Sequence, residues 1–330
     1  MSIQQYLFDL ESLIKRVPKT KTGELAKAMY IRSLTFFGND PKDLLSTLRD
    51  SYLKAYLLAE TPTYLPELWN RNLAELETLV QSLNPSRKIF VFSRLAETAN
   101  ALGYSHREYV NQAYEWLPKA SWKGRSRLVI SLSTLGHIEE ALAISRQLRP
   151  HLRATTLAEA SAMSPGSEIL LREAIEATKK VENTVRRIVA ISRLLKSYYL
   201  FDRYSSELFA EKICEKLSPV LTEVDAFLSL LVARNLAEAS MHTASMKLYV
   251  SAKNYLQQNL TLNNDIEEVL VQTALRAEGL DKALEMAYMS PRSWYLVPSL
   301  LSYAITSGYF NKTTISIVRQ HLEKKNPHLK

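Results

Sequence analysis

Glycine is scarce in this chain, which has only eight glycines in 330 residues, well below the usual share of about 7%. Turns between strands and phosphate-binding loops both depend on glycine, because it adopts left-handed backbone conformations without strain. The scarcity therefore argues against a β-sheet protein and against a Gly-rich nucleotide loop. No period-two alternation of apolar residues runs along the chain either, so we expect an all-α fold with no β-sheet.

Cysteine is nearly absent, with Cys214 as the single example. One thiol excludes an intramolecular disulfide and any cysteine-based metal cage. Cys214 stands in an apolar position between lysines in the segment AEKICEKLS, which predicts a small buried side chain. This usage fits a reducing compartment, and we expect a cytoplasmic protein.

Long apolar runs are missing as well. The apolar residues near the middle of the chain occur in short runs such as LLVA, far shorter than the roughly 20 residues that a bilayer requires. The amino-terminal segment has spaced apolar residues and late charges, which predicts a helix that packs on its neighbour and not a signal peptide. We therefore expect no membrane partner.

Catalytic and metal-binding motifs are not found. The six histidines form no His-x-x-x-His or His-Glu-x-x-His pattern, and no Gly-x-Ser-x-Gly occurs. His137, Glu139 and Glu140 are close together in STLGHIEEALAIS. Metal ligands on one helix face should be three or four residues apart on the same helix, whereas the two glutamates follow His137 by two and three residues across a predicted corner. We interpret this stretch as a solvated turn, and we expect no enzyme activity, no metal and no cofactor.

What the chain does have is a regular spacing of helix breakers. Pro85, Pro118 and Pro150 lie 33 and 32 residues apart, and proline starts a helix well but cannot continue one. Glycines fall between the prolines, where a left-handed helix end is expected. The pattern predicts pairs of helices repeating every 29 to 39 residues or so. The predicted glycine corners are Gly38, Gly103, Gly136, Gly166, Gly279 and Gly308.

Two segments after these corners resemble the second helix of a tetratricopeptide repeat. They are LGHIEEALAISRQL, with Ala141 and Leu142 as a small-plus-large packing pair, and EGLDKALEMA, with Ala283 and Leu284. The resemblance implies a TPR-like α-solenoid, with armadillo and HEAT arrays as open alternatives. The first helix of each pair departs from the family, because it lacks the small residue at the closest helix approach.

We divide the chain into a helical capping region, residues 1–84, and a continuous helical-repeat solenoid, residues 85–330. Terminal repeats of a solenoid are commonly irregular, and the spacing before residue 85 is irregular. Four helical segments are expected in the capping region, at residues 2–15, 24–37, 41–59 and 64–82.

The formal net charge of +8 is spread thinly along the chain, except between Lys119 and Arg153, a segment that contains seven basic residues and two acidic ones. Basic residues also recur near the start of several first helices. Each could simply cap the preceding helix end, an effect of roughly 0.3–1 kcal/mol, but four clustered cations around a tryptophan favour a partner or counterion. The predicted partner-binding residues are Lys119, Trp122, Lys123, Arg125, Arg127, Arg87, Arg153, Arg187 and Arg292.

The sequence thus predicts a non-enzymatic binding scaffold that holds a protein or peptide partner on a concave face made by the first helices, and the basic residues favour an acidic partner. The alternative is a nucleic-acid-binding α-solenoid that uses a basic face for phosphate contacts. Helical-repeat RNA readers use a fixed set of side chains per base, and no such set recurs in the predicted units.

Overall fold

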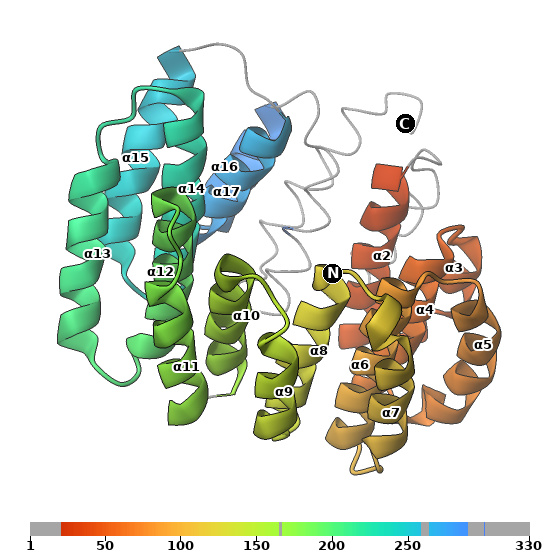
Figure 1. Cartoon of the computed structure of the whole chain (residues 1–330). Coiled ribbons are helices and arrows are strands. Elements are labelled where there is room, and N and C mark those ends of the chain that lie inside the picture. Colours follow the sequence, from red (N-terminus) through yellow and green to blue (C-terminus); the bar gives the residue numbers. More distant parts are fainter. Residues whose placement is uncertain (1–20, 165–166, 259–263, 290–299, 301–330) are drawn as a thin grey trace, which may run out of the picture. The chain divides into compact units, whose positions relative to one another are not determined.

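The computed structural model describes residues 21–164, 167–258, 264–289 and 300, and all regular elements in these ranges are helices (Figure 1). No strand occurs within them, which confirms the prediction of an all-helical fold. None of the helices in these ranges is both long and apolar enough to cross a membrane. The predicted helix at 2–15 and the predicted site residue Arg292 lie outside the described residues.

Two compact units make up the chain, and each is described by itself. Unit 1 comprises residues 1–84, 101–103 and 278–330, and unit 2 comprises residues 85–100 and 104–277. The division into a capping region and a repeat array stays a prediction. The helices of unit 1 are α2 (Lys21–Phe36), α3 (Lys42–Thr47), α4 (Ser51–Glu60), the 3-10 turns η1 (Thr61–Thr63) and η2 (Pro66–Leu68), α5 (Trp69–Gln81) and α17 (Leu280–Met289).

The single helix predicted at 41–59 is wrong, because α3 and α4 are separate helices. Asp50 begins α4 as its N-cap, and its side chain accepts a hydrogen bond from the backbone N–H of Tyr52 at 2.9 Å. The carboxylate of Glu24, on α2, accepts from the N–H of Arg49 at 2.6 Å. The break therefore depends on an aspartate cap and a contact from another helix, with no glycine or proline to mark it.

Unit 2 alternates between what we call first and second helices. The first helices are α6 (Pro85–Ala101), α8 (Trp122–Thr134), α10 (Pro150–Met163), α12 (Thr184–Tyr198), α14 (Glu223–Glu238) and α16 (Asn264–Ala277). The second helices are α7 (Arg107–Trp116), α9 (Ile138–Ser145), α11 (Glu168–Lys179), α13 (Arg203–Leu217) and α15 (His242–Gln258), and a 3-10 turn, η3 (Leu117–Lys119), precedes α8.

The first helices pack against one another in chain order. Helix α10 contacts both α8 and α12, and α14 contacts both α12 and α16. Second helices α9, α11, α13 and α15 contact the first helix before them. Each first helix from α10 to α14 therefore has a first helix on either side and its own second helix beside it (Figure 1).

Small polar side chains join successive first helices. Ser161 on α10 donates to Ser197 on α12 at 2.8 Å, and Asn235 on α14 donates to Ser192 on α12 at 2.8 Å. These four side chains are buried, so each needs a hydrogen-bond partner within the protein. Gly124 serves a related purpose at the start of α8, because an added Cβ would lie 3.1 Å from the Cα of Ser86 on α6.

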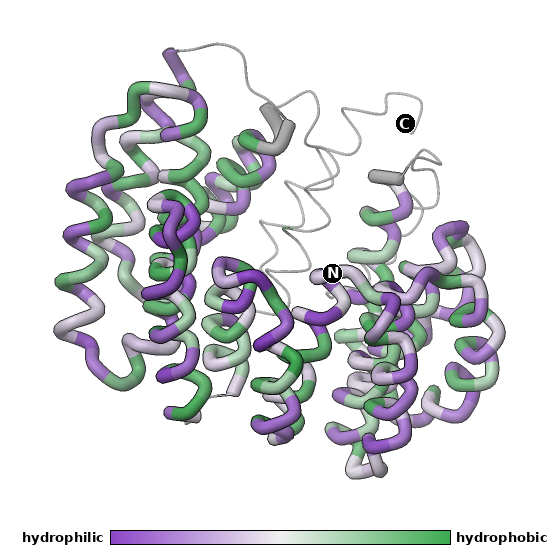
Figure 2. Tube along the Cα trace, viewed as in Figure 1, coloured by the Kyte–Doolittle hydropathy of each residue, from purple (hydrophilic) through white to green (hydrophobic). Residues whose placement is uncertain are grey.

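The predicted packing residues lie in the core. Leu95, Leu128, Ala141 and Leu142 are all buried, and the last three belong to one hydrophobic cluster of unit 2. Hydrophobic and hydrophilic residues alternate along these helices (Figure 2), as expected for helices that bury one face. Cys214 is buried, as predicted, and burial raises the pKa of its thiol to about 11.

Four of the predicted glycine corners are confirmed by a positive φ: Gly38, Gly103, Gly136 and Gly279. Gly166 and Gly308 lie outside the described residues. A fifth corner, between α14 and α15, was not predicted because its residue is Ser240, with φ 63°. The N–H of Met241 bonds to the carbonyl of Leu236 at 2.9 Å, as the N–H of His137 bonds to Leu132 after Gly136.

Gly136→Ala and Ser240→Gly are therefore expected to change stability in opposite directions. The alanine Cβ meets nothing within 4 Å, so its cost of about 1 kcal/mol comes from the left-handed backbone alone. Glycine at 240 relieves the same strain, which stabilises the folded state. It also raises the entropy of the unfolded chain, which opposes this gain, so we expect a net stabilisation of only a few tenths of a kcal/mol. Urea unfolding measures both, and a stabilising Gly136→Ala would contradict the assignment of these corners.

Candidate functional site

The predicted site residues that the structure describes lie at the beginnings of first helices. Lys119 ends η3, and Trp122, Lys123, Arg125 and Arg127 follow in the first two turns of α8. Arg87, Arg153 and Arg187 occupy the first turns of α6, α10 and α12. These cations therefore lie in or just before the first turns of first helices, and their role in binding a partner stays a prediction.

Three of these arginines are engaged within the fold. Arg127 donates from Nη2 to both carboxylate oxygens of Glu97, each at 2.6 Å. Arg153 donates to Glu173 at 2.5 Å, and Arg187 donates from Nε to the carbonyl of Val181 at 2.6 Å. The bonds of Arg127 and Arg153 join neighbouring helices, α8 to α6 and α10 to α11, and the bond of Arg187 fastens α12 to the turn that precedes it. These guanidinium groups therefore stabilise the packing within unit 2.

Trp122 and Arg125 instead open onto a cleft of about 420 Å³. The residues that line this cleft, which we call the Trp122 cleft, are Trp122, Arg125, Gln147, Leu148, Arg149, His151 and Leu152. Trp122 is 48% exposed, an unusual state for so large an apolar side chain. The side chain of Lys123 lies beside it, with Nζ 5.7 Å from the centre of the indole ring.

Local helix signals place these side chains. Ser121 is the N-cap of α8, so Trp122 is the first helical residue and Arg125 follows one turn later. Arg149 is the N-cap of α10, and Pro150 takes the first helical position, where proline is favoured. Two neighbouring first helices thus begin at the cleft.

The charge lining the Trp122 cleft is of one sign. No carboxylate is among its lining residues, whereas Arg125 and Arg149 both contribute to its walls. Burial lowers the pKa of His151, and the positive charges of Arg186 and Arg149 lower it further. The cleft therefore offers an anionic group two guanidinium groups beside an aromatic surface.

Arg149 and His151 were missing from the predicted site. The sequence contained a signal for Arg149, because it is one of the seven basic residues between Lys119 and Arg153. Its role depends on the turn that brings the end of α9 next to the start of α8, which no local pattern specifies.

A second recess lies on the first helices themselves, between α10, α12 and α14, and has a volume of about 200 Å³. Arg193, Lys196 and Arg234 line it together with Glu159 and Glu238. Arg193 lies 3.8 Å from Glu159. We call this the first-helix recess, and its charges are mixed.

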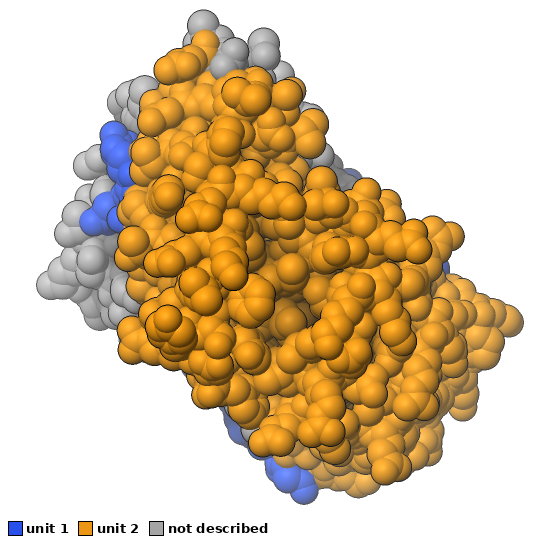
Figure 3. All heavy atoms as spheres, turned by 60° about the vertical axis from the view of Figure 1, so that its left-hand side comes forward, with its two compact units in different colours: residues 1–84, 101–103, 278–330 blue, residues 85–100, 104–277 orange. Residues whose placement is uncertain are grey.

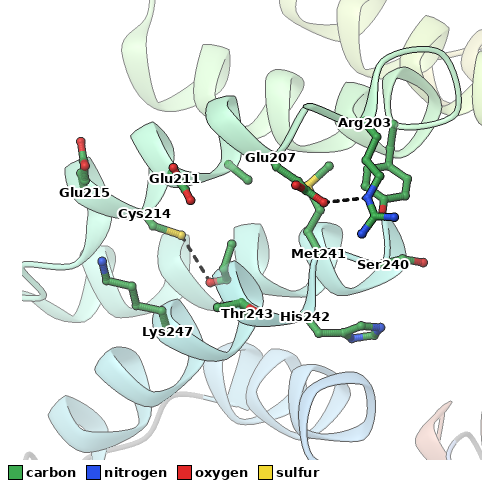
Figure 4. Close-up of a pocket in the computed structure, with 13 residues that line it drawn as sticks. Arg203, Glu207, Glu211, Cys214, Glu215, Ser240, Met241, His242, Thr243 and Lys247 are labelled. Atoms are coloured by element: carbon green, nitrogen blue, oxygen red, sulfur yellow. Dashed lines mark hydrogen bonds and ion pairs between the residues drawn. The ribbon is translucent and has the colours of Figure 1, made fainter. Parts of the chain in front are cut away.

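A larger cavity of about 580 Å³ lies between α13 and α15 (Figure 4). Cys214 donates from its thiol to the carbonyl of Ala244 at 3.3 Å, and Arg203 pairs with Glu207 at 2.9 Å. With its pKa near 11, the thiol stays protonated at neutral pH and is a poor nucleophile. The surface of unit 2 also shows hollows between ridges of side chains in the view of Figure 3.

The stretch around His137 is more than the solvated turn that the sequence predicted. His137 lies 2.9 Å from His106, Nε2 to Nε2, and each residue is the N-cap of a second helix. Glu140 on α9 accepts from Arg107 and from Tyr114, both at 2.7 Å. The corner therefore joins α7 to α9.

Within the described residues, no group of three or more His, Cys, Asp or Glu side chains is placed to hold a metal ion.

We expect acid to weaken this contact. Burial and the charges of His137 and Arg107 lower the pKa of His106 in the folded chain. The unfolded chain therefore binds a proton at this residue more readily than the folded chain does, and the free energy of unfolding falls as the pH drops below about 6.5. Hydrogen bonds from Arg107 and Tyr114 lower the pKa of Glu140, which extends the loss below about pH 4.5. The thermal unfolding midpoint should be lower at pH 5.5 than at pH 7.5. The difference between the two midpoints should be smaller in His106→Gln. An unchanged difference in the variant would contradict this assignment.

No protein-family model matches the chain, and neither a curated protein nor a solved structure matches it.

Proposed function

We propose that the helix pairs form a TPR-like α-solenoid and that the chain is a non-enzymatic scaffold for an acidic segment of a protein partner. The packing of first helices in chain order supports the solenoid, because a repeat array contacts its neighbours in this way. The recurrence of left-handed corners supports it as well. Arrays of this kind offer a long surface for an extended partner.

The observation that carries the binding proposal is the Trp122 cleft. Tryptophan and arginine are the residues most enriched at binding hot spots, and here they share one cleft with no carboxylate among its lining residues. Arg125 and Arg149 form no ion pair among the described residues, whereas Arg127 and Arg153 on the same helices are paired. An acidic side chain from a partner would supply the missing counter-charge.

Nucleic acid is the second candidate, and the net charge of +8 favours it. The first-helix recess argues against it, because Glu159 and Glu238 line the same surface as Arg193 and Arg234. A phosphate backbone that followed the first helices would meet these carboxylates. A peptide with both acidic and basic residues would match such mixed charges.

The test compares a short peptide rich in Asp and Glu with single-stranded RNA and double-stranded DNA at two salt concentrations. The peptide should bind the full chain, and Arg125→Glu with Arg149→Glu should weaken binding by about tenfold or more. Arg172→Glu is the matched control, since Arg172 is exposed on α11 outside the cleft. Tight, steeply salt-dependent binding of nucleic acid without peptide binding would overturn the proposal.

A further inference from the structure

We infer that the Trp122 cleft takes an aromatic phosphate monoester, namely the side chain of a phosphorylated tyrosine in the partner segment. The inference rests on the proposed function, because it names the group of the partner that enters the cleft. Two walls of different chemistry carry it, one apolar and one cationic.

The apolar wall suits an aromatic ring. Trp122 is 48% exposed, and Leu148 and Leu152 line the same cleft. Aromatic rings stack or meet edge to face over centroid distances of about 4.5–7 Å. The volume of about 420 Å³ lies at the low end of the usual range for small-ligand pockets, roughly 300–1,000 Å³. One ring bearing one phosphate is an occupant of the right size.

The cationic wall suits a phosphate. Arg125 has a single hydrogen bond in the described structure, to Gln147 at 3.5 Å, which is at the limit for such a bond. Arg149 comes from a different segment, the N-cap of α10, and lines the same cleft. Two guanidinium groups from two segments therefore face one space without a protein carboxylate.

A phosphate satisfies this pair better than a carboxylate does. A carboxylate has two oxygens and one charge, which a single guanidinium fork satisfies. A phosphate monoester has three free oxygens and a charge of about −1.5 to −2 at pH 7, enough for two forks. The nearby charge of Arg186, which acts on His151 at the same cleft, adds to the positive potential.

The combined lining of the Trp122 cleft favours a side chain that is apolar along its length and charged at its end. The apolar residues Trp122, Leu148 and Leu152 and the two arginines line the same cleft, so its occupant needs an apolar body and a charged end. Phosphotyrosine has both in one side chain. Phosphoserine has the charge without the ring, and tyrosine has the ring without the charge.

The experiment titrates the full chain with one acidic peptide in three forms, carrying tyrosine, phosphotyrosine or phosphoserine, with isothermal calorimetry as the readout. We expect the phosphotyrosine form to bind about tenfold to a hundredfold more tightly than the tyrosine form. The phosphoserine form should be intermediate. Arg125→Gln and Arg149→Gln should each remove most of the phosphate-dependent gain, and Arg172→Gln should not.

Trp122→Ala should bring the phosphotyrosine peptide down to the affinity of the phosphoserine peptide. Arg125→Lys and Arg149→Lys keep the charge and lose the planar fork, so we expect part of the gain to remain. Circular dichroism of each variant shows whether the fold is kept, and the Lys variants serve as the test if a Gln variant fails to fold.

The outcomes separate this inference from the proposed function. Equal binding of the tyrosine and phosphotyrosine peptides, both sensitive to Arg125→Glu, would overturn the inference and leave the scaffold proposal standing. If none of the three peptides bound the full chain, both the inference and the scaffold proposal would be wrong. Adenosine monophosphate is the fourth ligand, and if it bound as tightly as the phosphotyrosine peptide, a nucleotide would be the occupant and the inference would be wrong.

Discussion

Replacing Leu128 by alanine is expected to lower the free energy of unfolding by about 2–5 kcal/mol. Leu128 is 1% exposed and belongs to the hydrophobic cluster of unit 2. Helix α8, which carries it, packs against α9 and α10, so truncation leaves a cavity shared by neighbouring helices. The loss combines the transfer of three carbon atoms out of an apolar site with the contacts that the cavity lacks.

Urea unfolding followed by circular dichroism measures this loss, and Leu200→Ala is the matched control. Leu200 is 67% exposed after α12, so the same chemical change there should alter stability by less than about 0.5 kcal/mol. A loss below about 1 kcal/mol in Leu128→Ala would show that the helices around α8 close over the cavity or are loosely packed.

Glu97→Gln is expected to lower the free energy of unfolding by about 2 kcal/mol. The carboxylate of Glu97, on α6, accepts from Arg127 on α8 at 2.6 Å and lies 3.1 Å from Arg94. The side chains of Glu97 and Arg127 are 14% and 15% exposed, so the neutral amide leaves two guanidinium groups close together with little water to screen them. Breaking a fully buried pair costs about 3–5 kcal/mol, and the remaining exposure reduces the figure here.

Glu176→Gln provides the comparison, because Glu176 forms an ion pair with Lys179 on the surface of α11, with side chains that are 53% and 66% exposed. Removing it should produce no measurable change, as is common for exposed pairs. Both variants are measured by urea unfolding at low and at high salt. If Glu97→Gln is as harmless as Glu176→Gln, the Arg127–Glu97 pair does not hold α6 and α8 together.

The pairing of Arg127 also clarifies the predicted basic site. Arg125 and Arg127 are two residues apart on α8, which places them about 200° apart around the helix axis. Arg127 turns to Glu97 on α6, and Arg125 turns to the Trp122 cleft. The sequence showed a cluster of equal cations, and the structure divides them into those paired within the fold and those that line the cleft without an ion pair among the described residues.

The sequence by itself determined the features that depend on local backbone chemistry and on periodic burial. Gly103 and Gly136 end their helices because only glycine takes a left-handed conformation without cost. Ala141 and Leu142 are buried because a helix presents residues of the right spacing to its neighbour. Such signals need no knowledge of the rest of the chain, so the all-helical fold and most of its corners could be predicted.

Only the tertiary structure decided the rest. The break before α4 depends on Glu24 from α2, and the corner at Ser240 holds a non-glycine residue in a left-handed conformation. The Trp122 cleft joins residues from the start of α8 with Arg149, which lies 27 positions after Trp122 in the chain. A charge on a helix can turn to any of its neighbours, and which neighbour holds a carboxylate is set by how the helices pack. The sequence could therefore show that cations gather at the helix starts, but not which of them the fold pairs with a carboxylate.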